Sequence, residues 1–285
     1  MSETPAPQTR GKRIRRLILR SLWIGPLIYL GIVLVFLSLE HSLVFHPSSP
    51  AKWWLEPVDP KTQDVEFEDA NGTKLHGWWI PPHDPSAGAV LVAHGNGGNI
   101  THRGGLAADL HRNLGTGVLL FDYPGYGKSE GKPSESTCYD SGDAAYLWLK
   151  NVAHIAPNRI VLLGESLGGG IAVELATRHE HRALVLVYTF TTLPEAAKFR
   201  YPWLPTKLLM RTRFDNLSKL GRCTRPVFIA HGTADEIVPF HHGEQLFAAA
   251  NEPKEFLRME GMPHNMPLGD TLGLPLAQFL AKYAP

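Results

Sequence analysis

Five short runs in the chain are apolar throughout, which is typical of strands buried on both faces of a parallel sheet. They lie at residues 89–93, 117–121, 160–163, 183–188 and 226–230. The stretches between them repeat apolar residues every three to four positions, which predicts amphipathic helices at 102–114, 140–153, 171–177, 244–251 and 272–283. A further strand is expected at 254–259. Because strands alternate with helices, we expect an α/β fold with a mostly parallel central sheet and helices on both faces.

Two segments depart from this alternation. Residues 64–68 alternate polar and apolar side chains, and the dipeptide Asn71-Gly72 favours a tight hairpin, so residues 73–80 are the expected returning strand. Residues 189–225, approximately, have no strand pattern and are rich in aromatic, basic and proline residues. We interpret them as a small cap on an α/β domain that spans residues 58–285.

Residues 21–39 form an uncharged, mainly apolar run of 19 residues. A helix rises about 1.5 Å per residue, so this run crosses most of a hydrocarbon core of about 30 Å. The alternative is a cleaved secretory signal, but the run is longer than the usual 7–15 residues or so, and no small-residue cleavage site follows it. We therefore expect a transmembrane helix that acts as a signal anchor, with the lipid bilayer as its partner, followed by a linker at residues 40–57.

Charge is distributed unevenly along the chain. Six of the 28 basic residues lie in the tail formed by residues 1–20, which holds one acid, Glu3. This arrangement predicts a cytoplasmic N-terminus and an extracytoplasmic body, which in a bacterium would lie on the periplasmic side of the inner membrane. The other 22 basic residues are outnumbered by 26 acidic ones, so no nucleic-acid surface is indicated. Cys138 and Cys223 form neither a disulfide framework nor a metal-ligand spacing, so we interpret them as ordinary thiols.

The strand at 160–163 runs directly into a helix through the pattern Gly164-x-Ser166-x-Gly168. Such a sharp strand-to-helix turn strains the backbone of the middle residue and needs glycine two places on either side. It also holds the serine hydroxyl above a helix N-terminus, whose N–H groups can bind an oxyanion. The pattern alone is weak, but its strand and helix context predicts that Ser166 is a nucleophile.

A serine nucleophile needs a base beside it and a carboxylate that orients the base. Asp235 follows the strand at 226–230, and His264 lies in a loop after the strand at 254–259. The chain order Ser166, Asp235, His264 is the one expected for a hydrolase of this architecture. Asp122 is the rival acid, but it precedes the serine, and we interpret it as a loop-fixing residue. His94 and His231 each precede glycine at a strand end, and we interpret them as supports of loop geometry.

Hydrolysis also requires two backbone N–H groups directed at one point, the oxyanion hole. One is expected to be the N–H of Leu167, the residue after the nucleophile. The other is expected from the loop after the first parallel strand, His94-Gly95-Asn96-Gly97. We assign it to Asn96, with Gly97 as the alternative.

Together these stretches resemble the α/β-hydrolase superfamily, and more narrowly its BEM46-like branch, which is related to membrane-associated abhydrolase-domain proteins and to a group of serine peptidases. The resemblance covers about residues 58–283 and rests on the segments 94–99, 121–129, 164–169, 213–216 and 231–239. It implies the same roles for Ser166, Asp235 and His264, and an N-terminal anchor is common in that branch. Such proteins often have glycine directly before the histidine, where this chain has Pro263. The motifs are specific for fold and mechanism but not for substrate.

The expected function is a membrane-anchored serine hydrolase that cleaves acyl esters without a metal or cofactor. Its substrate would be a small or lipid-like ester, with an acyl pocket formed by aromatic and aliphatic cap residues: Phe190, Phe199, Tyr201, Trp203 and Leu204. An amidase or aminopeptidase with the same triad is an alternative. A catalytically silent membrane scaffold is the other, although a scaffold has no physical need for a strained serine.

Overall fold

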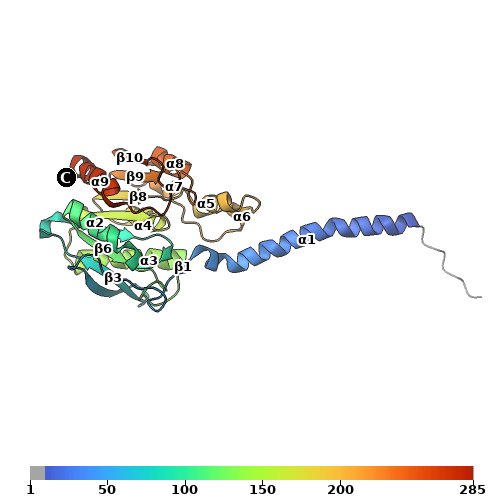
Figure 1. Ribbon diagram of the computed structural model, residues 1–285, viewed down its shortest axis with the longest axis horizontal. Coiled ribbons are helices and arrows are strands. Elements are labelled where there is room, and N and C mark those ends of the chain that lie inside the picture. The colour runs from blue at the N-terminus through green and yellow to red at the C-terminus, as the bar shows by residue number, and fades with distance from the viewer. Residues whose placement is uncertain (1–9, 285) are drawn as a thin grey trace, which may run out of the picture. The chain divides into compact units, whose positions relative to one another are not determined.

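The computed structural model describes residues 10–284 (Figure 1). The chain divides between Leu43 and Val44 into two compact units. In the first unit, helix α1 (Arg10–Val44) contains Pro26. Within the described residues, Leu22–Val44 is the one segment long and apolar enough to cross a membrane. The predicted helix at 21–39 lies inside α1, which extends beyond both predicted ends, so residues 40–44 are helical and do not belong to a linker.

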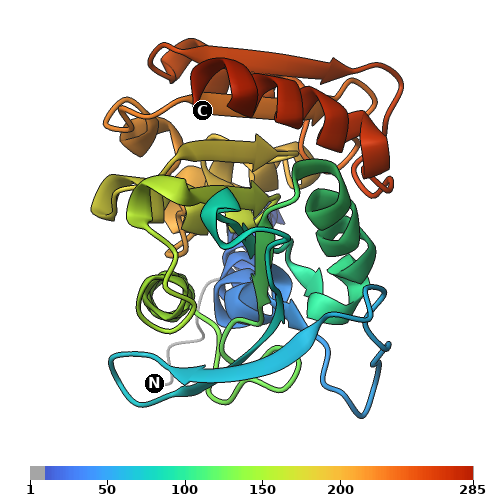
Figure 2. The same ribbon diagram turned by 90° about the vertical axis from the view of Figure 1, so that its left-hand side faces the viewer.

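The second unit is built around an eight-stranded sheet, with the strand order β10-β9-β8-β7-β4-β6-β3-β2. The strands are β2 (Gln63–Glu68), β3 (Lys74–Ile80), β4 (Ala89–Ala93), β6 (Gly117–Phe121), β7 (Ile160–Glu165), β8 (Ala183–Val187), β9 (Val227–Gly232) and β10 (Lys254–Met259). Strands β2 and β3 pair antiparallel, as do β3 and β6, and the other neighbours pair in parallel. Figure 2 shows this order from β10 at the top to β2 and β3 at the bottom.

The central strands are apolar throughout because both of their faces are covered. Every residue of β4, β6 and β8 is buried. Leu91 and Leu162 belong to a core that includes Ile171 of α4, whereas Val92 and Leu163 belong to a second core with Phe279 of α9. Since side chains alternate across a strand, each strand contributes to both cores. The predicted α/β architecture, with helices on both faces of a mostly parallel sheet, is confirmed.

Eight α-helices of the second unit lie between the strands or after them. They are α2 (Gly104–Leu114), α3 (Glu135–Asn151), α4 (Gly168–Arg178), α5 (Leu193–Arg200), α6 (Thr206–Leu209), α7 (Leu217–Leu220), α8 (His241–Ala249) and α9 (Gly269–Tyr283). Three short 3-10 turns are η1 (Pro85–Ala87), η2 (Ile100–Arg103) and η3 (Pro157–Arg159). Helices α5, α6 and α7 occupy the segment predicted to be a strand-free cap.

Several helix starts differ from the prediction. Helix α3 begins at Glu135 because Ser134 caps it: the Ser134 hydroxyl accepts from the Thr137 N–H, and the Thr137 hydroxyl accepts from the Ser134 N–H. Because of this reciprocal cap, the helix starts five residues before the predicted residue 140. Helix α4 begins at Gly168 rather than at residue 171, so three consecutive glycines lie inside it. Packing against the sheet overrides the poor helix propensity of glycine there.

The segment directly after α1 belongs to the second unit. Strand β1 (His46–Pro47) pairs in parallel with β5 (Gly97–Gly98). The Phe45 ring lies edge-on to Phe214, 6.4 Å between ring centres. Residues 45–47 are therefore fixed against the body, where the sequence predicted a linker.

Candidate active site

The turn between β7 and α4 holds Ser166 in a strained backbone conformation. The φ angle of Ser166 is 51°, in the left-handed region that non-glycine residues rarely adopt. A Cβ on Gly168 would lie closer than 3.0 Å to the carbonyl group of Ala93, and one on Gly164 would lie equally close to the backbone of Gly168 and Gly169. The two glycines are thus required by close backbone packing, as the sequence pattern predicted.

The structure brings the three predicted side chains together at the carboxyl ends of β7, β9 and β10. His264 Nε2 lies 3.1 Å from Ser166 Oγ, and His264 Nδ1 lies 2.7 Å from Asp235 Oδ2. Both Asp235 and His264 are buried, whereas Ser166 is half-buried. These are hydrogen-bond distances along a chain from carboxylate to imidazole to hydroxyl, although the serine and histidine are 98 positions apart.

Asp235 is surrounded by donors that favour its ionised form. Its Oδ1 accepts from the N–H groups of Ile237 and Val238, at 2.9 and 2.7 Å. Burial by itself would raise the pKa of Asp235, but hydrogen bonds with His231 and His264 hold it well below its usual range. The carboxylate is therefore charged at neutral pH and accepts a hydrogen bond from the Nδ1–H group of His264. With the proton on Nδ1, Nε2 of His264 can accept a hydrogen bond from the Ser166 hydroxyl.

His231 contacts the carboxylate of Asp235, an interaction that the sequence analysis did not predict. Its Nε2 lies 3.3 Å from Asp235 Oδ2 and 2.8 Å from the carbonyl oxygen of Val238. Because a carbonyl oxygen only accepts, Nε2 of His231 must carry a proton. His231 thus supports the loop after β9, as predicted, and also donates toward Asp235. The i, i+4 spacing of the two residues was the available signal.

The two predicted oxyanion-hole donors are unpaired. Within residues 10–284, neither the Leu167 N–H nor the Asn96 N–H donates a hydrogen bond to another protein group. The Asn96 side chain is anchored, since its Oδ1 accepts from the His46 N–H and from the Tyr126 hydroxyl at 3.2 and 3.0 Å. Gly97, the alternative donor, is part of β5 and pairs with His46.

A buried ion pair connects this loop to the serine turn. Arg103 donates through Nε and Nη2 to the two carboxylate oxygens of Glu165, at 3.1 and 2.8 Å, and through Nη1 to the carbonyl oxygen of Gly97. Burial alone would lower the pKa of Arg103 and raise that of Glu165, but the ion pair reverses both shifts. Glu165 directly precedes Ser166, so Arg103 links the serine turn to the loop that carries Asn96. The only signal in the sequence was a charged residue inside a buried G-x-S-x-G turn.

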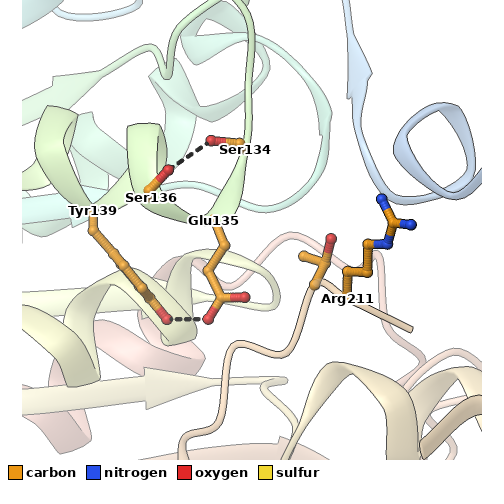
Figure 3. A pocket seen from close by; sticks show the side chains of 6 residues that line it. Ser134, Glu135, Ser136, Tyr139 and Arg211 are labelled. Atoms are coloured by element: carbon orange, nitrogen blue, oxygen red, sulfur yellow. Dashed lines mark hydrogen bonds between the residues drawn. The ribbon is translucent and has the colours of Figure 1, made fainter. Parts of the chain in front are cut away.

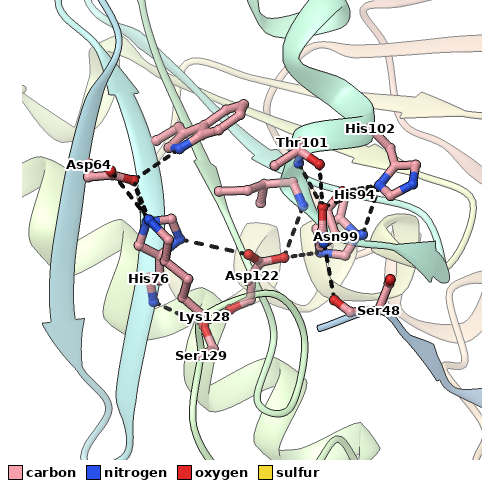
Figure 4. Close-up of polar contacts among 12 residues, drawn as sticks. Ser48, Asp64, His76, His94, Asn99, Thr101, His102, Asp122, Lys128 and Ser129 are labelled. Atoms are coloured by element: carbon pink, nitrogen blue, oxygen red, sulfur yellow. Dashed lines mark hydrogen bonds and ion pairs between the residues drawn. The ribbon is translucent and has the colours of Figure 1, made fainter. Parts of the chain in front are cut away.

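Asp122 lies at the centre of a second buried network beneath this loop (Figure 4). Its Oδ1 accepts from the Ile100 N–H at 3.0 Å and lies 3.7 Å from His94 Nε2, while its Oδ2 lies 3.8 Å from His76 Nδ1. His94 Nδ1 lies 2.6 Å from the Gly95 carbonyl oxygen, and burial lowers the pKa of His94 to about 4. The contacts of Asp122 hold the loops that carry His94 and Ile100, in agreement with the loop-fixing role indicated by the sequence.

The cap residues predicted to line one acyl pocket do not share one environment. Phe190 and Leu204 are buried in the core, whereas Phe199 and Trp203 are about half exposed. The exposure of two of the five side chains contradicts a single enclosed pocket formed by all of them. Phe190 is part of the main hydrophobic core on one face of the sheet, so its burial reflects packing against the body.

A separate pocket of about 440 Å³ lies at the N-terminus of α3 and does not include the three converging residues (Figure 3). Its lining residues are Ser134, Glu135, Ser136, Tyr139, Arg211 and Thr212. The Glu135 carboxylate already accepts from the N–H groups of Arg213 and Phe214 and from the Tyr139 hydroxyl. Glu135 therefore attaches the end of the cap to α3, and we assign this pocket no part in the chemistry.

An eight-stranded, mostly parallel sheet with a strained serine between strand and helix defines the α/β-hydrolase class. Residues 88–217 match the family model described as the alpha/beta hydrolase fold. An uncharacterised protein of Mycobacterium tuberculosis is 38% identical over 238 residues, which cover 83% of this chain and 84% of that protein. The human alpha/beta hydrolase domain-containing protein 17B is 34% identical over 176 residues, 62% of this chain and 60% of that protein.

Solved structures agree on the fold. The Pyrococcus furiosus esterase Pf2001 superimposes with a TM-score of 0.69 at 21% identity and covers 85% of this chain and 99% of its own. Est1E of Butyrivibrio proteoclasticus, solved with ferulic acid, has a TM-score of 0.65 at 19% identity and covers 77% of this chain and 99% of its own. The chain belongs to the α/β-hydrolase family.

Proposed function

We propose that this protein is a membrane-anchored serine hydrolase that cleaves acyl esters through an acyl-enzyme intermediate. The observation that carries the proposal is the continuous contact from Asp235 through His264 to Ser166 Oγ, with distances of 2.7 and 3.1 Å. The unpaired backbone N–H groups of Leu167 and Asn96 could bind the oxyanion that develops on the substrate carbonyl. The similar solved structures include esterases, which supports ester substrates for this chain.

In the first half of the proposed reaction, Ser166 Oγ bonds to the ester carbonyl carbon while its proton moves to His264 Nε2. The carbonyl oxygen becomes an oxyanion and accepts from the N–H groups of Leu167 and Asn96. The ionised Asp235 stabilises the imidazolium through Nδ1. As the bond from carbon to the alcohol oxygen breaks, His264 gives its proton to the leaving alcohol.

In the second half, water attacks the acyl carbon and gives its proton to His264 Nε2. The bond between Ser166 Oγ and the acyl group then breaks, and the histidine returns the proton to the serine. A carboxylic acid leaves, and the free enzyme is restored. Every proton in the proposed reaction passes through His264 Nε2. The reaction therefore needs the His264 ring held between Ser166 Oγ and the Asp235 carboxylate.

We also propose that α1 anchors the protein in a bilayer, with the basic tail in the cytoplasm and the hydrolase unit outside, as in the periplasm of a bacterium. Leu22, Trp23, Leu27 and Ile28 of α1 are each more than half exposed, an arrangement suited to lipid rather than to a protein core. Arginine and lysine precede the apolar segment, in agreement with the positive-inside rule.

The function is tested with matched p-nitrophenyl esters and p-nitroanilides of the same acyl groups. We expect turnover of esters, abolished by Ser166→Ala and unchanged by the control Ser218→Ala, which removes an exposed serine hydroxyl. Turnover of the anilides alone would replace the esterase proposal with the amidase one. No turnover of either series, across acyl lengths from two to twelve carbons or so, would favour a silent scaffold.

A further inference from the structure

Two short cap helices expose large apolar side chains. Phe199 near the end of α5, Trp203 in the following turn and Leu208 in α6 are 56%, 49% and 84% exposed. Helices α5 and α6 are labelled in Figure 1. By contrast, Phe190 and Leu204 of the same segment are buried. Three large apolar groups so close in sequence are unusual on a surface that meets only water.

Basic residues accompany these apolar side chains. Residues 193–213 contain five basic residues and one acid, Glu195, although the chain after residue 20 has more acids than bases. The basic residues are Lys198, Arg200, Lys207, Arg211 and Arg213. Lys207 pairs with Glu195, so the charges that remain are positive. Aromatic and aliphatic groups mixed with lysine and arginine match the headgroup region of an anionic bilayer.

The chain enters the hydrolase unit at the base of the same cap. The Phe45 ring contacts Phe214, which lies between α6 and α7 in the cap segment. The His46 N–H donates to Asn96 in the proposed oxyanion loop. Residue 46 is two positions beyond the end of α1, and two residues span at most about 7 Å. If α1 crosses a bilayer, the covalent connection keeps residues 45–47 within a short reach of the membrane surface, and these residues contact Phe214 of the cap segment and Asn96.

We propose that this cap surface, defined by Phe199, Trp203 and Leu208 with Lys198 and Arg200, rests in the headgroup layer of an anionic phospholipid bilayer. The inference rests on the membrane anchor proposed above and deepens that function. The active site then opens beside lipid. Esters dissolved in the bilayer would be the substrates present at the highest concentration there. Lateral entry of such an ester avoids its transfer through water, which is costly for a long acyl chain.

The contact is measured on the full chain in phospholipid vesicles by a probe that needs no turnover. Leu208→Cys is labelled with an environment-sensitive nitrobenzoxadiazole dye, and the native cysteines do not interfere because Cys138 and Cys223 are buried. Leu147→Cys on α3, where the native side chain is 43% exposed, is the matched control. Vesicles contain phosphatidylcholine alone or with phosphatidylglycerol, and a shallow nitroxide-labelled lipid serves as quencher.

We expect the dye at position 208 to emit at shorter wavelength and to be quenched at least threefold more than the dye at position 147. Phosphatidylglycerol should increase the difference, and Lys198→Gln with Arg200→Gln should reduce it. Equal quenching at the two positions in both vesicle types would overturn the proposal while the Ser166 chemistry could still be observed. Release of the chain by alkaline carbonate would overturn the anchor and the cap contact together. Ester turnover is measured on the same vesicles, so loss of activity is recorded separately from loss of contact.

Discussion

Arg103 and Glu165 form a buried two-pronged ion pair that joins the loop after β4 to the turn that holds Ser166. Both side chains are more than four-fifths buried, and Arg103 also binds the Gly97 carbonyl oxygen. The guanidinium of Arg103 therefore links the residue that precedes Ser166 to the residue that follows Asn96. Lysine would preserve the charge at residue 103 but could not bind both carboxylate oxygens and Gly97 in the same geometry.

The first prediction concerns this pair. Arg103→Lys should lower kcat about 10–100-fold with a small change in KM, because an error of about 1 Å at a reacting centre can have an effect of that size. Glu165→Gln should destabilise the fold by about 3–5 kcal/mol, since it leaves Arg103 buried without its counter-ion. Steady-state kinetics and denaturant unfolding in detergent check both effects.

Arg112→Lys is the control for that experiment. Arg112 lies in α2, the helix that directly follows Arg103, but its side chain is exposed and pairs with Asp109. It should leave kcat and stability nearly unchanged. Equal behaviour of the Arg103 and Arg112 variants would show that the ion pair does not position the site.

The second prediction concerns the orienting acid. Asp235→Asn should lower kcat by about 10⁴, because an amide donates toward Nδ1 and favours the wrong imidazole tautomer. Asp270→Asn changes an exposed carboxylate and should have no effect on kcat. A loss below tenfold for Asp235→Asn would remove Asp235 from the proposed mechanism. The measurement is ester turnover under saturating substrate.

The third prediction tests the packing of the serine turn. Gly168→Ala should destabilise the hydrolase unit by several kcal/mol or prevent folding, because its Cβ would overlap the Ala93 carbonyl group. Gly105→Ala in α2 is the matched change, since nothing lies within 4 Å of its added Cβ. It should stabilise the protein by about 0.5–1 kcal/mol through helix propensity. Chemical denaturation monitored by circular dichroism compares them, and similar midpoints would contradict the packing argument.

The fourth prediction is a pH dependence of stability. Burial lowers the pKa of His94 from 6.5 to about 4, so the folded state holds the imidazole neutral while the unfolded state takes up a proton below about pH 6.5. The stability that depends on a neutral His94 is fully present above pH 6.5 and is lost progressively as the pH falls to about 4. The loss amounts to about 3 kcal/mol.

His94→Gln cannot take up that proton. Its free energy of unfolding should decline less than that of the native protein between pH 6.5 and 4, while the two slopes should agree above pH 7.5. Parallel curves over the whole range would mean that His94 is protonated as easily in the folded protein as in the unfolded chain.

Local patterns predicted most of the fold and the nucleophile turn. The apolar runs mark the buried strands because parallel strands have no polar face, and Gly164 and Gly168 mark a turn whose crowding involves only nearby backbone. The proposal of Asp235 and His264 followed from chain order and from their positions after β9 and β10. The contacts of His264 with Ser166 and with Asp235 are structural findings, and the catalytic roles of the three residues stay a prediction.

Features that depend on pairing between distant segments could not be predicted. Arg103 and Glu165 are 62 positions apart, and nothing in either local sequence indicates the other. The start of α3 was missed because the cap formed by Ser134 and Thr137 lies before the periodic apolar pattern begins. The cap residues were grouped by composition, but burial separates Phe190 and Leu204 from Phe199 and Trp203 because only tertiary packing decides which side chains face inward.

The most direct test of the account is covalent labelling of the full chain with a fluorophosphonate, followed by intact-mass and peptide analysis. The probe reports an activated serine without assuming any substrate. We predict one adduct per chain, located on Ser166, with no adduct on Ser166→Ala and at least a hundredfold slower labelling of Asp235→Asn. Absence of labelling in the folded native protein, or an adduct on a different serine, would contradict the claim that Ser166, His264 and Asp235 act together.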